Sequence, residues 1–122
     1  NRIDWVRCDD GNVTFVEVKR MDDGRMLHDT DATPEVVFQM NRYKQFIEKY
    51  QPQLLLYYQK LYDIKKNLGL PVPDSKPVSI NDNPELLIFD RWEKNTKGRE
   101  KHRQRLYDIL KDKIKFQVMT GL

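Results

Sequence analysis

The stretch that decides the fold is RIDWVRCDDGNVTFVEVKR, residues 2–20. Residues 2–8 and 13–20 are rich in Val, Ile, Phe and Trp, which favour β-strands over helices. Between them, residues 9–12 read DDGN, and Asp-Gly is typical of the tight turn of a hairpin. The chain is therefore expected to contain an antiparallel β-hairpin close to residue 2.

The register of this hairpin is expected to bring two acidic side chains together. Whether Asp10 and Gly11 alone form the loop, or all four turn residues do, Asp4 lies opposite Glu17, and Lys19 shares their face. Opposed carboxylates repel across a strand pair, and a bound divalent cation beside Lys19 would offset that repulsion. The pattern predicts a metal site. If the turn is offset, these are separate surface carboxylates and an ordinary lysine at a strand end.

A helix is expected from residue 34 to about residue 50, because Thr33 before Pro34 is typical of a helix start, with Thr as the cap and Pro as the first helical residue. Its apolar residues recur at helical spacing: Val36, Met40, Tyr43, Ile47 and Tyr50. Pro52 interrupts the pattern, and a second helix is expected to end at Gly69.

The remaining sequence completes an α/β order. Residues 70–84 contain four prolines and predict an irregular connection rather than a linker between domains. The other expected elements are the second helix, a buried strand, a third helix and a final strand, over residues 53–68, 86–89, 97–113 and 115–120. We expect one domain over residues 1–122, with helices packed on a central mixed sheet.

Three segments together resemble a known family. RIDWV, then TFVEVKR, then QMNRY in the first helix resemble the metal-binding signature of the PD-(D/E)XK nuclease superfamily. Gln39 and Tyr43 are similar to the Gln-x-x-x-Tyr element of its RecB-like branch. The resemblance implies a restriction-endonuclease-like fold whose hairpin carries the metal site. It also implies a helix and a strand upstream of the Asp-bearing strand, so these elements are expected to be missing from this chain.

The resemblance also implies a chemistry. The implied catalytic residues are Asp4, Glu17, Lys19, Gln39 and Tyr43. Mg2+ or Mn2+ would be held by Asp4, Glu17 and the carbonyl of Val18, and Lys19 would orient a water molecule or stabilise charge on the phosphate. Gln39 and Tyr43 would steady the lysine or touch the nucleic-acid backbone; as alternatives, Tyr43 is a core aromatic and Gln39 a plain polar helix residue. The implied reaction is hydrolysis of phosphodiester bonds in DNA, with RNA not excluded.

Positive charge is concentrated in one segment. The net charge is only +3, yet residues 91–105 hold seven Lys or Arg against Glu93 and Glu100. Such a segment is suited to binding phosphates. The expected nucleic-acid contacts are Lys94, Lys97, Arg99, Lys101 and Arg103. The alternative is a solvated helix face.

Composition narrows the class of protein. No apolar run approaches the roughly 20 residues that cross a bilayer, so no membrane association is expected. Cys8 is the only cysteine, which excludes an internal disulfide and fits a reducing, cytoplasmic setting. One cysteine and two histidines make a structural zinc site a poor explanation.

Two other functions stay open beside the nuclease. The first is a catalytically silent nucleic-acid-binding module of the same fold, in which the basic segment holds the strand. The second is a protein-interaction subunit that uses the tyrosine-rich helices, including as a homo-oligomer. Salt dependence would separate these two, because phosphate contacts weaken steeply with ionic strength and apolar interfaces do not.

Overall fold

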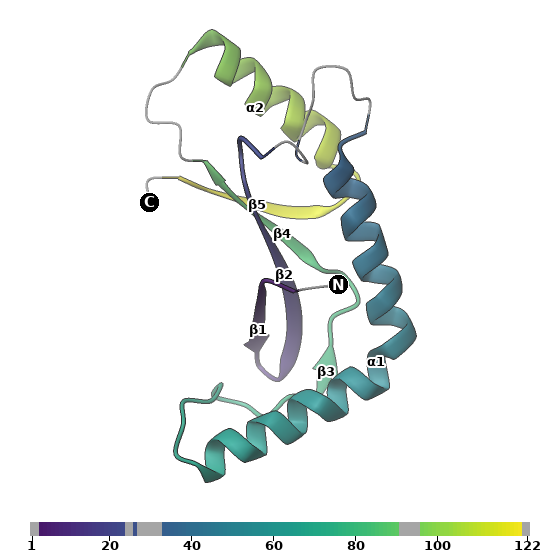
Figure 1. Ribbon diagram of the computed structural model, residues 1–122, viewed down its shortest axis with the longest axis vertical. Coiled ribbons are helices and arrows are strands. Elements are labelled where there is room, and N and C mark those ends of the chain that lie inside the picture. The colour runs from purple at the N-terminus through teal and green to yellow at the C-terminus, as the bar shows by residue number, and fades with distance from the viewer. Residues whose placement is uncertain (1–2, 24–25, 27–32, 91–95, 121–122) are drawn as a thin grey trace.

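The computed structural model describes residues 3–23, 26, 33–90 and 96–120. In chain order the elements are β1 (Trp5–Asp9), β2 (Asn12–Arg20), α1 (Glu35–Asn67), β3 (Ser79–Ile80), β4 (Glu85–Asp90), α2 (Lys97–Leu110) and β5 (Lys115–Thr120). These elements build one mixed sheet and two helices (Figure 1). The mixed α/β class expected from the sequence is confirmed.

The sheet combines antiparallel and parallel pairing. Its strands lie in the order β1-β2-β4-β5, and β3 pairs with β2 off this path. β1 and β2 are antiparallel, whereas β2 runs parallel to both β3 and β4, and β4 runs parallel to β5. The parallel pairs require crossover connections, and α1 and α2 supply them. The short strand β3 lies within the segment expected to be irregular, so that expectation was wrong for Ser79 and Ile80.

The hairpin register matches the prediction. Trp5 pairs with Val16, and the pairing continues to Asp9 and Asn12, which leaves a two-residue loop. Both loop residues have positive φ, 50° at Asp10 and 81° at Gly11, as the primed turns of hairpins require. A local turn preference therefore sets which residues face each other along the two strands.

The two helices that were expected follow each other across a kink as one continuous span, α1. α1 runs from Glu35 to Asn67 with a kink, where Tyr50 has non-helical angles just before Pro52. Proline removes a backbone donor and clashes with the preceding turn, and here this bends the helix without ending it. The cap is Pro34, in extended conformation and without a side-chain bond, so the expected Thr33 cap was wrong by one residue.

The far end of α1 follows the expected pattern. Gly69 has a φ of 73° and its N–H donates to the Lys66 carbonyl, while the N–H of Leu70 donates to the Lys65 carbonyl. This pair of bonds is a Schellman motif, which satisfies carbonyls that the helix leaves open. Thr96 caps the start of α2, and its hydroxyl accepts from the N–H of Arg99; α2 ends at Leu110, three residues earlier than expected.

The core lies on one face of the sheet. Leu86 and Ile88 of β4 share a cluster with residues from both helices: Val36, Val37, Met40, Tyr43, Leu106 and Leu110. Phe116 of β5 packs against the same cluster, and its register partner is Leu86. Among the described elements, α1 and α2 therefore cover the same face. Neither of them combines the length and apolar character that a membrane span needs.

A second, smaller cluster holds the tip of the hairpin. Val13 and Phe15 of β2 pack with Ile47 of α1 and Ile80 of β3. Figure 1 shows the C-terminal half of α1 running past β3 at this end of the molecule. The two clusters fix α1 across β2, and this determines which of its side chains reach the polar residues of that strand.

Candidate functional site

Asp4 is held against the second strand by a backbone bond. Its Oδ2 accepts a hydrogen bond of 3.0 Å from the N–H of Val18. Asp4 itself precedes β1, which begins at Trp5, so the expectation that it lies within the strand was wrong. The antiparallel register extended by one residue nevertheless sets it opposite Glu17, and the carboxylate remains exposed.

Glu17 and Lys19 form a buried ion pair on β2. Each side chain is only 5% exposed, and Lys19 Nζ lies 2.6 Å from Glu17 Oε1. The pair projects from the face that the helices cover, because Glu17 is the register partner of Leu86 and Lys19 that of Ile88. Ionised groups at such depth persist only when paired, so each charge keeps the other in place.

The first half of α1 adds two polar side chains to this pair. Gln39 Nε2 donates to Glu17 Oε1 and to the hydroxyl oxygen of Tyr43, at 3.3 Å in both cases. Gln39 and Tyr43 are four residues apart, so they lie on one face of the helix. The five residues that the sequence singled out as catalytic therefore meet at one place: Asp4, Glu17, Lys19, Gln39 and Tyr43.

Tyr43 is kept in its neutral form by its surroundings. Burial raises the pKa of its hydroxyl above the ordinary value of 10.0. The negative charges of Glu17 and Asp4 and a hydrogen bond with the Glu17 side chain act in the same direction. The hydrogen bond with Gln39 lowers this pKa but does not outweigh them. At neutral pH the hydroxyl is thus protonated. Tyr43 also packs in the larger core cluster, so its core role and its place at the site coexist.

The two oxygens of Glu17 have different environments. Oε1 accepts from both Lys19 and Gln39, whereas Oε2 is buried and has no hydrogen-bond partner among the described residues. The same is true of Gln39 Oε1. Buried acceptors without partners are rare because their desolvation is not compensated. A cation or an ordered water beside Glu17 Oε2 would supply the missing interaction.

The available donor atoms suit a hard divalent ion. Carboxylate and carbonyl oxygens are the ligands that Mg2+ prefers, and Asp4, Glu17 and Val18 supply both kinds. Within the described residues no group of three or more His, Cys, Asp or Glu side chains is placed to hold a metal. An ion here would thus rest on two carboxylates, with a carbonyl and water molecules completing its shell.

Access to this site is restricted on the helix side. The cavity that touches Glu17 and Tyr43 has a volume of about 10 Å³, close to what one water molecule needs. A nucleotide does not fit such a space. Among the described residues, the exposed part of this site is Asp4, just before β1.

The basic segment is only partly available for binding. Lys94 lies outside the described residues. Lys97 and Lys101 are exposed on α2, and Arg99 is half-buried. Arg103 makes two hydrogen bonds to the carboxylate of Asp90, at 2.6 and 3.3 Å, and these raise the pKa of its guanidinium. The segment was predicted as one binding surface, but Arg103 also ties α2 to the end of β4.

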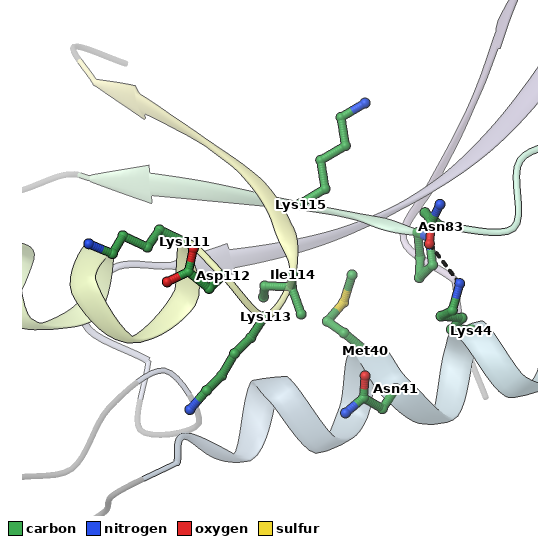
Figure 2. Close-up of a pocket in the computed structure, with 10 residues that line it drawn as sticks. Met40, Asn41, Lys44, Asn83, Lys111, Asp112, Lys113, Ile114 and Lys115 are labelled. Atoms are coloured by element: carbon green, nitrogen blue, oxygen red, sulfur yellow. Dashed lines mark hydrogen bonds between the residues drawn. The ribbon is translucent and has the colours of Figure 1, made fainter.

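A second group of basic residues was not predicted. A cavity of about 380 Å³ between α1, the start of β4 and the turn before β5 is lined by four lysines, Lys44, Lys111, Lys113 and Lys115 (Figure 2). The alternating KDKIK of residues 111–115 is a sequence signal for this basic group, but it predicted only the end of a helix and the start of a strand. Lys44 could not be grouped with them, because only the packing of α1 brings it there.

Comparison with family models, with curated proteins and with solved structures finds no match to this chain. The geometry of the site therefore carries the functional interpretation.

Proposed function

We propose that the chain is a Mg2+- or Mn2+-dependent nuclease that hydrolyses phosphodiester bonds of DNA, on a restriction-endonuclease-like fold whose hairpin carries the metal site. One observation carries the proposal. Glu17 presents a buried, unpartnered Oε2 while Lys19 and Gln39 both occupy its Oε1. A carboxylate arranged in this way has one oxygen oriented by the protein and the other left for a ligand.

The metal would be held by Asp4, Glu17 and the carbonyl of Val18. When bound, the ion would supply Lewis acidity toward the phosphate and toward water. Lys19 would remain beside Glu17 Oε1 and place its ammonium where negative charge develops on the phosphate during hydrolysis. Because the ion and the ammonium would use different oxygens of Glu17, the existing ion pair is compatible with a loaded site.

Gln39 and Tyr43 would act as positioning residues. The Gln39 amide bridges Glu17 and Tyr43, which restricts the rotation of the Glu17 carboxylate and so fixes the direction of Oε2. The hydroxyl of Tyr43, which is neutral at physiological pH, accepts a hydrogen bond from that amide and holds it in place. A preoriented ligand loses less conformational freedom on binding, so this bridge favours metal affinity.

The choice of DNA rests on the family resemblance and on positive charge. The exposed Lys97 and Lys101 of α2 would contact phosphates, which are common to DNA and RNA. The lone Cys8 supports the further proposal of a reducing, cytoplasmic setting.

A silent nucleic-acid-binding module of the same fold is the second candidate. It is favoured by the ion pair between Glu17 and Lys19, which already neutralises the buried carboxylate without a metal. Under this proposal Oε2 would be satisfied by water, and phosphate binding would not depend on a divalent ion.

The deciding experiment is calorimetric titration of Mn2+ into the wild-type chain and into Asp4→Asn and Glu17→Gln. The proposal expects saturable binding that both substitutions weaken, followed by Mn2+-dependent cleavage of single- and double-stranded DNA by the wild type alone. Glu48→Gln, an exposed glutamate of α1, is the matched control and should bind as the wild type does.

Glu17→Gln leaves a buried lysine without its partner, so its folding must be checked by circular dichroism. Asp4 is exposed and its substitution leaves the buried pair intact, so this variant keeps the test valid if Glu17→Gln unfolds. Mn2+ binding equal in wild type and Asp4→Asn would reject the assigned site. Metal-independent DNA binding without cleavage would favour the silent module.

A further inference from the structure

The lysine-lined cavity is a separate feature from the candidate metal site. Met40 and Lys44 line it, whereas Gln39 and Tyr43, their neighbours on α1, contact Glu17. Met40 and Lys44 each follow Gln39 and Tyr43 by one residue, which turns them about 100° around α1 from those two side chains. The cavity, at about 380 Å³, is also far larger than the 10 Å³ beside Glu17. It can therefore accept a ligand that the metal site does not.

Two of its four lysines are already paired. Lys44 Nζ donates to Asn83 Oδ1 at 2.7 Å and lies 3.2 Å from Glu48 Oε1. Lys115 Nζ pairs with Glu85 Oε1 at 2.8 Å, and Figure 2 shows this side chain extending away from α1. Its two partners hold Lys44 in a defined position at the rim of the cavity. Lys115 instead links β5 to β4 through its ion pair with Glu85.

The other two lysines have no such partner. The ammonium groups of Lys111 and Lys113 make neither an ion pair nor a hydrogen bond within the described part of the chain, and both residues are exposed. In Figure 2, Lys113 reaches toward α1, on the side where Asn41 lies. The lining contains four lysines and only one acidic residue, Asp112, so its net charge is positive.

A helix-capping role explains only part of this arrangement. A cation near the C-terminus of α2 is favourable, and Lys111 at the cap position satisfies that preference. It does not account for Lys113 or for the amides of Asn41 and Asn83, which come from other elements. Met40, Pro84 and Ile114 add an apolar floor, where charge interactions are stronger than in bulk water.

We propose that this cavity binds a phosphate group, carried either by the backbone of a polynucleotide or by a small phosphorylated compound. Lys111 and Lys113 supply the charge, and the amides of Asn41 and Asn83 supply further hydrogen-bond donors. No metal is involved in this contact. The inference thus goes beyond the proposed nuclease activity and would hold for a silent module as well.

The test uses the double variant Lys111→Glu/Lys113→Glu in the presence of EDTA. The matched control is Lys49→Glu/Lys60→Glu, which changes the net charge by the same amount on exposed positions of α1 outside the cavity. Binding of a fluorescein-labelled oligonucleotide is followed by anisotropy over a range of salt concentrations. Binding of pyrophosphate is followed by calorimetry. Circular dichroism verifies that both variants are folded.

If the ligand is a polynucleotide, the cavity variant should bind the oligonucleotide about tenfold more weakly than the wild type, with a shallower salt dependence. The affinity of the control variant should change far less. For a small phosphorylated compound, pyrophosphate should bind the wild type saturably and the cavity variant not at all. Equal losses in both variants would show a nonspecific effect of net charge and overturn the proposal. So would a wild type that binds neither probe.

Failure here is distinguishable from failure of the proposed function. Asp4→Asn should weaken Mn2+ binding and leave the binding of both phosphate probes unaffected, whereas the cavity variant should retain Mn2+ binding. A loss of Mn2+ binding together with a loss of phosphate binding in a single variant would mean that the two sites are not separate, and would contradict the assignment of this cavity.

Discussion

Lys19 Nζ lies 2.6 Å from Glu17 Oε1, and both side chains are almost fully buried under α1. Two residues apart on one strand, they face the same way and neutralise each other inside the core. This contact links stability to the candidate chemistry. Among the described residues, the carboxylate that would bind a metal is also the one that forms an ion pair with Lys19.

Breaking this pair from one side should cost more than removing it altogether. Lys19→Met leaves a buried carboxylate unpaired, and about 3–5 kcal/mol of unfolding free energy should be lost. The double variant Glu17→Leu/Lys19→Met should lose clearly less, because no charge stays buried. Urea denaturation followed by circular dichroism measures both. As a control, Arg20→Met removes an exposed pair with Asp22 and should cost below about 1 kcal/mol. Equal losses in the single and double variants would contradict the coupling.

Mn2+ should stabilise the fold if the proposed site is correct. A ligand that binds only the native state adds RT ln(1 + [L]/Kd), about 2.7 kcal/mol at a hundredfold excess over Kd. Thermal unfolding of the wild type should shift upward with Mn2+ concentration, and that of Asp4→Asn should not. A shift of equal size in both proteins would place the ion elsewhere.

Alanine substitution at Gly11, Gly69 and Gly98 should change the unfolding free energy by different amounts. At Gly11, φ is 81° and an added Cβ would lie 2.9 Å from Val78 Cγ2 and 3.1 Å from the Lys76 carbonyl oxygen. Strain and clash act together there, so we expect a loss of about 2 kcal/mol or more. At Gly69 the φ of 73° acts alone in open space, which should cost about 1 kcal/mol.

Gly98 is the internal control for this series. It lies in the first turn of α2, and an added Cβ would meet only Thr96 Oγ1, at 3.9 Å. Alanine there should stabilise by up to about 1 kcal/mol because it restricts the unfolded chain. Chemical denaturation of the three variants gives the order, and a Gly11→Ala protein as stable as Gly69→Ala would show that the contact with Val78 relaxes without cost.

Acid should weaken the link between three strands. Glu85 of β4 bonds to Arg7 of β1 and Lys115 of β5. Burial pushes the pKa of Glu85 upward, but the hydrogen bonds from Arg7 and Lys115 outweigh it and hold the pKa below the ordinary value of 4.5. The stabilisation is therefore complete above pH 4.5 and is lost as the pH falls through the lower pKa of the folded state.

Glu85→Gln should remove this dependence. The difference in unfolding free energy between wild type and Glu85→Gln should be constant near neutral pH and shrink as the pH falls below about 4.5. Urea denaturation across this pH range measures it. A difference that stays unchanged down to the acid transition would mean that the carboxylate has no special environment in the folded chain.

Local sequence was sufficient for several elements. The turn at Asp10 and Gly11 predicted the hairpin register, and β5 begins and ends at the predicted residues, Lys115 and Thr120. Gly69 ends α1 as expected. In each case a short stretch of backbone has one favourable conformation, so neighbours along the chain decide the outcome. The kink at Tyr50, just before Pro52, also lies where the sequence predicted an interruption, although the two halves of α1 continue into one another.

By itself, the sequence predicted that Asp4 faces Glu17 beside Lys19, because strand alternation and the Asp10-Gly11 turn favour this register. Only the tertiary structure decided that Gln39 donates to Glu17 Oε1 while Oε2 stays buried without a partner among the described residues. It also decided that Lys44 and Lys113 line the same cavity. These contacts depend on where the crossover places α1 above the sheet. That placement is set by the summed packing of two apolar clusters, a long-range quantity that no short stretch of sequence contains.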